Sequence, residues 1–307
     1  MGADKKKGSI KRKLGIALLG VFGLLACAFA GVHFVSASKL AQTVEVEVTD
    51  IKVPDGDKDA IERGQYLVNH LMGCKECHGE DLGGKAVMDN GAMGVWYAPN
   101  LTKGKGSSVA EFTGRDWMRA LRHGVGKDGR RLLLMPSDDY VNFGDEDMGA
   151  VVAFLRALPK VDRENQGISL GPVAKGLVAA GELQFAFDKI DHKAARPEAE
   201  PGPNKEWGKV LVGTCAGCHG SGLSGGKIPG GDPKWPDAGN ITTDKETGVG
   251  AWSYADFAKA MREGKRPDGT SINEAMPWKI YSGMNDDDLK ALWAYLKTVP
   301  PKAKGGR

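Results

Sequence analysis

The chain has 307 residues, of which 41% are hydrophobic and 26% are charged, so it is long enough for two or three small domains and is neither disordered nor fibrous in composition. Its net charge is +3, but the first 38 residues hold six basic side chains and one acidic one, which leaves about −2 for the remainder. Phosphate binding requires clustered Lys and Arg, and none occurs beyond the N-terminus, so we expect no nucleic-acid partner.

The first 38 residues resemble a membrane anchor. A basic flank at 5–13 precedes 22 residues, 14–35, that contain no Asp, Glu, Lys or Arg. At 1.5 Å per residue this stretch spans a hydrocarbon core of about 30 Å. The basic flank places the anchor in a bacterial cytoplasmic membrane with the rest of the chain on the periplasmic side. Cleavage near 36–38, and lipidation of Cys27 after a lipobox-like 24–26, are the alternatives.

Residues 39–54 are predicted to form an extended tether. Apolar and charged residues alternate over 43–48, which is the period-2 pattern of extended chain, and a turn follows at 54–57.

An internal repeat organises the remainder. Cys74, Cys77 and His78 recur as Cys215, Cys218 and His219, each displaced by 141 residues. The same displacement carries 135–136, Met-Pro, onto 276–277. We therefore predict two homologous domains at 55–160 and 203–307, joined by a linker at 161–202.

Each copy is predicted to be helical, which makes the expected fold class all-α. Capping-box patterns predict helix starts at 113–116 and 253–256. The last helix of each copy carries an apolar stripe that must be buried. Gly64 and Gly208, in the first helices, are expected to permit close helix crossing.

The repeated Cys-x-x-Cys-His run is the attachment signature of c-type haem. Its two thiols add to the porphyrin vinyl groups and the adjacent His ligates iron. A zinc site would need four N or S ligands grouped within one copy, and a thioredoxin-like pair would be a single motif in a βαβ setting. We therefore predict two covalently bound haem c groups, attached through Cys74 and Cys77 and through Cys215 and Cys218.

The axial ligands follow from the repeat. His78 and His219 are the proximal ligands, and Met135 and Met276 each lie 57 residues further on. Proline after each Met disfavours helix at that position and suits a side chain directed at a flat macrocycle. Each His is expected to donate its other ring N–H to a backbone carbonyl at 98–100 or 238–240.

Other side chains are weaker candidates. His70 lacks a counterpart in the second copy, and His123 and His192 are expected at the surface. Four aromatic residues are candidates either for lining haem crevices or for ordinary core packing: Tyr140, Tyr281, Trp117 and Trp252.

Over residues 60–304 the sequence resembles the membrane-anchored multihaem cytochrome c subunits of periplasmic alcohol, sugar-acid and related dehydrogenases. The resemblance rests on the Cys-x-x-Cys-His and Met-Pro motifs, on Asn-x-Thr at 100 and 240, and on Asp-Gly at 268 and its copy. The run 242–252 and Ala-Tyr-Leu at 294–296 complete it. It implies tandem class I cytochrome c domains with His/Met iron. Many members carry three haems, whereas this chain has two motifs.

The expected function is single-electron transfer between a periplasmic dehydrogenase or quinol-oxidising complex and a downstream acceptor, without catalysis. Six-coordinate His/Met iron offers no open site for a substrate. The alternatives are a haem c subunit of a terminal oxidase and, against the duplicated Met residues, a di-haem peroxidase.

Overall fold

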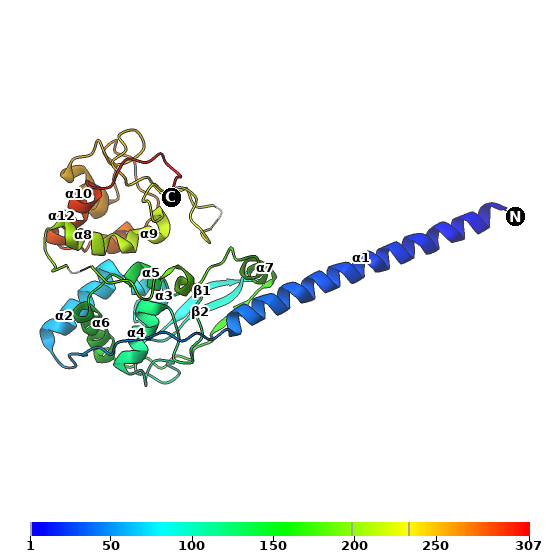
Figure 1. Ribbon diagram of the computed structural model, residues 1–307, viewed down its shortest axis with the longest axis horizontal. Helices are drawn as coiled ribbons and strands as arrows, with labels where there is room; N and C mark the ends of the chain where they lie inside the picture. The colour runs from blue at the N-terminus through cyan, green and yellow to red at the C-terminus, as the bar shows by residue number, and fades with distance from the viewer. Residues whose placement is uncertain (1, 198, 233) are drawn as a thin grey trace.

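The computed structural model describes residues 2–197, 199–232 and 234–307, with side chains from residue 12 onward. Two lobes lie one above the other, and one long helix, α1 (Gly2–Ala41), projects away from them (Figure 1). Within α1, residues 12–41 are long and apolar enough to cross a membrane. This helix therefore meets the length and composition of the predicted anchor.

The first lobe follows α1 in the chain. Its elements are α2 (Lys58–Tyr66), a π-helix η1 (Leu67–Leu71), α3 (Cys74–His78), β1 (Lys85–Asn90), β2 (Gly94–Ala98), α4 (Gly114–His123), α5 (Ser137–Tyr140) and α6 (Asp145–Ala157). Three further elements follow before the second lobe: β3 (Ile168–Leu170), α7 (Pro172–Ala180) and a 3₁₀ turn η2 (Ala186–Lys189).

The second lobe repeats the helices of the first. It contains α8 (Lys205–Leu211), α9 (Gly213–His219), α10 (Tyr254–Glu263), α11 (Trp278–Tyr281) and α12 (Asp286–Leu296). The first and last helices of each lobe pack on each other, α2 on α6 and α8 on α12. Long loops between these helices form the rest of the lobe.

Glycine makes both helix crossings possible, as predicted. A Cβ atom added to Gly64 would lie 2.0 Å from the Ala150 carbonyl oxygen, and one added to Gly208 would lie 2.0 Å from that of Ala291. Such contacts are impossible for any other residue, so the two crossings depend on the missing side chain.

The predicted capping boxes are present in α4 and α10. Thr113 and Ser253 each cap their helix, and Asp116 and Asp256 bond back to the cap residue. The stripe along α6 is fully buried, and along α12 it is buried except for the half-exposed Trp293, which stacks on Phe257. These local predictions are confirmed.

The all-α prediction is wrong in one respect. β1, β2 and β3 form a three-stranded antiparallel sheet in the order β1-β2-β3, with Lys85 opposite Ala98 and Trp96 opposite Ile168. The hairpin turns at Asn90-Gly91, which is a hairpin sequence, and its third strand comes from the segment between the copies. Local helix signals could not indicate this strand because it pairs across about 70 residues of chain.

The segment 42–57 is extended, but it packs on the first lobe rather than hanging free. Val44 donates its backbone N–H to the Gly129 carbonyl at 2.9 Å, and Val48 and Ile51 are buried in the main core. The intervening glutamates, Glu45 and Glu47, point to solvent, as the alternation requires.

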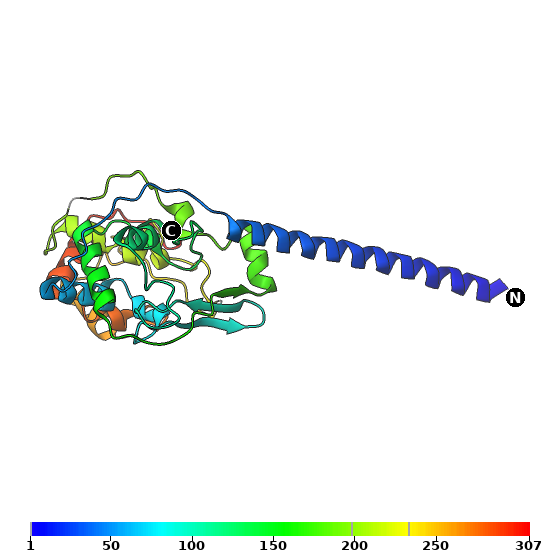
Figure 2. The ribbon, with the colours of Figure 1, turned by 90° about the horizontal axis from the view of Figure 1, so that it is seen from below.

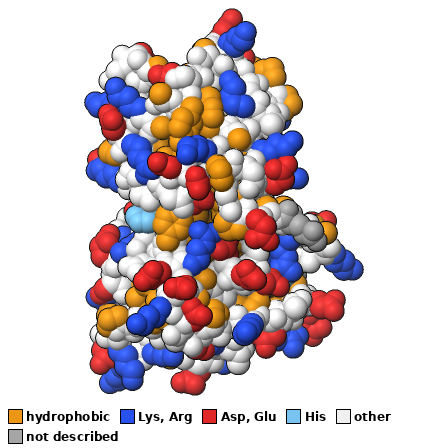
Figure 3. Space-filling model, turned by 90° about the vertical axis from the view of Figure 1, so that its left-hand side faces the viewer, with side chains coloured by type: hydrophobic (Ala, Val, Ile, Leu, Met, Phe, Trp, Pro, Cys, Tyr) orange, Lys and Arg blue, Asp and Glu red, His pale blue; other side chains and the backbone are white. Residues whose placement is uncertain are grey.

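The two lobes meet through reciprocal contacts. α5 of the first lobe packs on α9 of the second, and α11 of the second packs on η1 of the first. On the side of the molecule opposite α1, apolar side chains gather near the boundary between the lobes, while acidic and basic side chains are interspersed (Figure 3). Each lobe thus places the helix after its Met-Pro motif against the attachment region of the other.

Candidate functional site

The two Cys-x-x-Cys-His motifs occupy equivalent places in the lobes. Each lies in a short helix, α3 or α9, that ends at a glycine with positive φ, Gly79 at 85° and Gly220 at 81°. A non-glycine residue would be strained there. The glycine turns the chain sharply after the histidine.

Both histidines are held in one orientation by the carbonyls predicted from the sequence. Nδ1 of His78 lies 2.8 Å from the Pro99 carbonyl oxygen, and Nδ1 of His219 lies 2.7 Å from that of Gly239. Nδ1–H donates in each case, which leaves Nε2 as the acceptor for a metal ion. Burial lowers the pKa of both imidazoles and the carbonyl bond partly opposes it, so the neutral, metal-binding form is favoured.

The Asn-x-Thr blocks brace the carbonyl loops. Asn100 donates from Nδ2 to the Val161 carbonyl at 2.6 Å, and Asn240 donates to that of Lys302 at 2.8 Å. Each Asn also accepts from the Thr two residues on, and all four side chains are buried. These residues tie the loop facing each histidine to the chain after the last helix. Their repetition signalled a shared role, but only the structure shows what it is.

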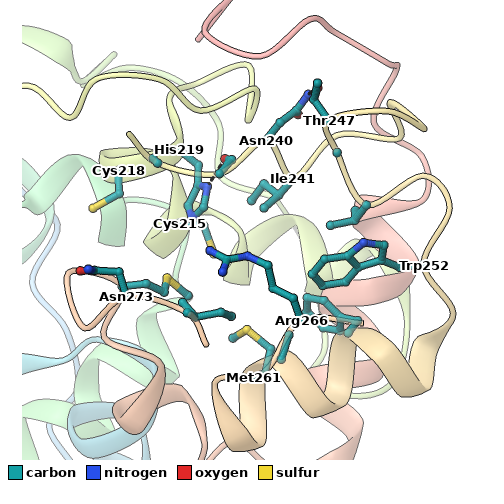
Figure 4. Close-up of a pocket in the computed structure, with 18 of the residues that line it drawn as sticks. Cys215, Cys218, His219, Asn240, Ile241, Thr247, Trp252, Met261, Arg266 and Asn273 are labelled. Atoms are coloured by element: carbon teal, nitrogen blue, oxygen red, sulfur yellow. Dashed lines mark hydrogen bonds between the residues drawn. The ribbon is translucent and has the colours of Figure 1, made fainter. Parts of the chain in front are cut away.

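In the second lobe the predicted site residues surround one cavity of about 390 Å³. His219, Cys215 and Cys218 form one wall, and Met261 and Trp252 lie on the other side (Figure 4). Met276 also lines it. The apolar part of the lining includes Ile241, Val249, Leu292 and Leu296. A largely apolar cavity with a His and a Met among its walls fits a hydrophobic macrocycle that needs two axial ligands.

In the first lobe the equivalent residues are packed more closely. Cys74 and His78 are buried, at 8% and 7% exposure, whereas Cys77 is exposed. Met135 is half-buried and packs against the same core cluster that includes Cys74. The donor set of this lobe is therefore the same as that of the second.

One cavity residue was missed by the sequence reasoning. Arg266 extends into the cavity of the second lobe, toward Cys215 (Figure 4), and donates to the Ser271 carbonyl at 2.8 Å. The repeat places Gly126 at this position in the first lobe, since the bridge Val125–Arg131 corresponds to Lys265–Ser271. An arginine is suited to the carboxylate groups of a haem edge, and only this difference between the copies signalled it.

The other histidines do not reach the two sites. Nδ1 of His70 lies 3.2 Å from the Ile280 carbonyl oxygen, so His70 joins the two lobes. The surface prediction is wrong for His123, which is 7% exposed and lies against His192 with 2.9 Å between their Nδ1 atoms. Burial and the neighbouring His192 lower the pKa of His123 to about 4, which keeps it neutral.

The four aromatic candidates divide between the two expected roles. Trp252 lines the second cavity, and Trp117 is core, packed edge-on against Phe112 at 5.5 Å. Tyr140 donates to the Met72 carbonyl at 2.6 Å, and Tyr281 donates to that of Thr214 at 3.4 Å. Both tyrosines therefore fix the chain just before a Cys-x-x-Cys-His motif.

A zinc site is not supported. Among the described residues no group of three or more His, Cys, Asp or Glu side chains is placed to hold a metal ion. Burial raises the pKa of the Cys74 and Cys215 thiols to about 12, so neither is a thiolate at neutral pH. The geometry instead defines two His-bearing, Cys-x-x-Cys sites of the haem c class.

Comparison with known sequences agrees with this class. The chain belongs to the cytochrome c family, whose sequence profile matches residues 61–159 and 206–300. It is thus an electron-transfer protein that carries two covalently bound haem c groups.

Several curated relatives are similar over most of the chain. The cytochrome c subunit of alcohol dehydrogenase (quinone) from Gluconobacter oxydans is 26% identical over 95% of this chain and 62% of its own length. The gluconate 2-dehydrogenase cytochrome c subunit of Pantoea cypripedii is 30% identical, over 79% and 60%. A diheme cytochrome c-type protein of Cereibacter sphaeroides is 29% identical, over 74% and 82%. The chain spans about 60% of the length of the dehydrogenase subunits.

Proposed function

We propose that this cytochrome is a membrane-anchored, two-haem electron relay on the periplasmic side of a bacterial cytoplasmic membrane, serving a dehydrogenase complex. The observation that carries the proposal is the reciprocal packing of two His/Met modules in one chain, with α1 at one end. The dehydrogenase subunits that the chain resembles support the choice of donor.

The chain's own residues have four roles in this proposal. Cys74 with Cys77, and Cys215 with Cys218, hold the two haems covalently. His78 and His219 ligate iron through Nε2, with the Pro99 and Gly239 carbonyls fixing the ring orientation. Met135 and Met276 complete the coordination.

Bound haem c supplies one-electron Fe(III)/Fe(II) chemistry, and thioether ligation favours the reduced state. The protein contributes by keeping both axial positions filled and by excluding water from the iron. His/Met ligation therefore favours electron transfer over substrate turnover.

The contact between the lobes supports a relay rather than two independent carriers. A Cβ atom added to Gly217, between Cys215 and Cys218, would lie 2.9 Å from a carboxylate oxygen of Asp139, four residues after Met135. In the opposite direction, a Cβ atom on Gly73 would lie 3.5 Å from Ile280, four residues after Met276. The attachment region of each lobe therefore touches the Met-ligand segment of the other.

The axial ligands are tested on detergent-solubilised holoprotein by haem quantitation and a potentiometric titration of the optical spectrum, with and without carbon monoxide. We expect two haems per chain and no carbon monoxide reaction. Met135→Leu and Met276→Leu should each create one carbon monoxide-reactive haem and lower its potential, since each substitution removes a thioether at nearly constant volume.

Met261→Leu is the matched control for Met276→Leu, because Met261 lines the same cavity. It should leave both haems unreactive. Carbon monoxide binding to the native protein, or an unchanged spectrum for Met276→Leu, would contradict the assigned ligands and favour an enzymatic role.

The proposed partner is tested separately. Affinity purification of the full-length chain from its native membranes should recover a dehydrogenase subunit in constant ratio, and adding that enzyme's substrate should reduce both haems. Recovery of an integral oxidase, with no substrate-dependent reduction, would point to the oxidase alternative.

A further inference from the structure

The segment between the two haem domains contains a helix that neither haem site uses. α7, with the sequence Pro-Val-Ala-Lys-Gly-Leu-Val-Ala-Ala, has one charged residue, Lys175, in nine. Its residues do not line the cavity of the second lobe. A nearly uncharged helix on the outside of a water-soluble lobe needs a partner for its outer face.

α7 is fixed to the end of α1. Lys39 of α1 donates from Nζ to the carbonyls of Val178 and Ala179, both at 3.1 Å. These are carbonyls of the last turn of α7, where a cation is favoured. The contact makes the end of α1 and the end of α7 one unit.

A separate apolar cluster completes this unit. Its buried members are Trp96, Leu133, Leu170, Ala174, Val178 and Phe185, and Leu40 of α1 packs against it. Arg131 lies 4.2 Å from the centre of the Phe185 ring and donates to the Lys39 carbonyl at 3.1 Å. The sheet, α7 and the end of α1 therefore share one small core, distinct from the core of the haem domains.

The position of this unit along α1 coincides with the end of the apolar stretch. Large apolar side chains on α1 are exposed from Leu14 to Val35, and the next residue, Ser36, is buried at 1% exposure. A bilayer core of about 30 Å takes about 20 helical residues. If that stretch spans the bilayer, no spacer separates the lipid from the lobe.

The direction of α7 also fits a lipid surface. α7 lies beside the end of α1, on the side of the lobes from which α1 leaves (Figure 1), and it runs across the direction of α1 rather than along it (Figure 2). A helix oriented across a membrane-spanning helix lies along the membrane plane. That is the orientation of interfacial helices.

Exposed apolar side chains gather at the same place. Among the described residues outside α1, the large hydrophobic side chains that are exposed are Ile168, Val173 and Trp235. Ile168 is in β3 and Val173 is in the first turn of α7, at 42% and 49% exposure. Two of the three therefore belong to the unit that adjoins α1.

We propose that α7 and β3 form a lipid-binding face that lies in the bilayer interface and holds the first haem domain against the membrane. The occupant is the lipid surface itself, because the face continues directly from the apolar stretch of α1. This inference rests on the proposed anchoring by α1. It gives α1 a second function, since the helix then fixes the first domain, and not only the chain, at the membrane.

The test uses the full-length holoprotein in phosphatidylethanolamine and phosphatidylglycerol vesicles that contain a phospholipid with a diazirine close to its headgroup. After illumination, peptides that carry lipid are identified by mass spectrometry. We expect lipid on peptides of α1 and on the peptide that contains β3 and α7. The loop around Trp235 should carry none.

The double variant I168N/V173N should lower lipid attachment to the α7 peptide about fivefold and leave attachment to α1 unchanged, since it removes apolar contact without changing charge. Trp235→Asn is the matched control, because it removes an equally exposed apolar side chain from the second lobe. It should change neither signal.

The outcomes separate this inference from the proposed anchoring. Lipid on α1 but not on α7 would overturn the lipid-binding face and leave the anchor intact, as would an unchanged α7 signal in I168N/V173N. Absence of lipid from both helices, with release of the protein by alkaline carbonate, would overturn the anchoring on which the inference rests.

Discussion

The imidazoles of His78 and His219 show how much of the two haem sites depends on single side chains. Each needs a free Nε2, a fixed ring plane and a neutral state. One backbone carbonyl provides the first two by accepting from Nδ1–H, and burial provides the third by lowering the pKa. Because the acceptor is a carbonyl, Pro99 in one lobe and Gly239 in the other serve equally well.

Asp139 is the least ordinary single residue at the boundary between the lobes. Its carboxyl group lies against Gly217, inside the second attachment motif. Burial, followed by the charge of Asp138, raises its pKa to about 7, while Lys189 and a hydrogen bond from Gly217 oppose the shift. Asp139 is thus protonated in the folded protein at pH values where the unfolded chain is ionised.

We expect Asp139→Asn to flatten the pH dependence of stability. Because the folded pKa lies above the unfolded value of 3.8, the folded state binds more protons between about pH 4 and 7, so stability falls as pH rises through this window. The difference amounts to at most about 4 kcal/mol. Thermal unfolding of the holoprotein at pH 5 and pH 8 should show a smaller loss in the variant.

Asp287→Asn is the control for this prediction. Asp287 is exposed and pairs with Lys290 at 3.7 Å, so its loss should leave the pH profile unchanged. Identical profiles for Asp139→Asn and the native protein would show that this carboxyl does not remain buried when haem is bound.

At the scale of helices and strands, the sequence predicted the features that depend on local spacing. The capping boxes at Thr113 and Ser253, the stripe of α6 and the crossings at Gly64 and Gly208 all follow from residues within a few turns of one another. The three-stranded sheet was not predicted, because its third strand is supplied by a distant segment. The burial of His123 was missed for the same reason, since His192 covers it from 69 residues away.

The glycine crossings give a direct test of the shared architecture. Gly208→Ala should lower the free energy of unfolding of the second lobe by about 1–3 kcal/mol or more, because the new methyl group would meet the Ala291 carbonyl and force α8 away from α12. Chemical denaturation, followed by the spectrum of the haem in each lobe, measures the change.

Gly176→Ala is the matched control for Gly208→Ala. Gly176 lies within α7, and a methyl group there would meet nothing within 4 Å. That substitution should be neutral or stabilise the protein by up to about 1 kcal/mol. If Gly208→Ala proved as harmless as Gly176→Ala, the two helices would not cross as closely as described.

For the whole molecule, the important question is whether the lobes act as one unit. The first lobe contributes Tyr66, which donates to Asp288 at 2.5 Å and accepts from the backbone N–H of Asn285 at 2.9 Å. Asp288 is 2% exposed and also accepts from Trp207 at 2.5 Å. Arg63 adds a contact across the boundary, 5.5 Å from the Trp207 ring.

This network joins the first helix of one lobe to the first and last helices of the other. A buried carboxylate with two strong donors holds its surroundings in one arrangement, and loss of one donor leaves part of its charge unpaired. The haem sites would then keep their own ligands but lose their fixed relation to each other.

Tyr66→Phe should therefore weaken the association of the lobes without damaging either haem site. Removing the hydroxyl takes one donor from Asp288 and an acceptor from Asn285, at a cost of about 1–3 kcal/mol. Calorimetry of the holoprotein should show the single unfolding transition of the native chain broaden or divide into two, while the optical spectra and carbon monoxide insensitivity of both haems persist. Tyr281→Phe removes a hydroxyl that bonds only within the second lobe in the described contacts, to Thr214, so it should lower the stability of that lobe and leave the coupling intact. Equal behaviour of the two variants would mean that the lobes are held together by apolar packing alone, and that the buried carboxylate does not set their relative position.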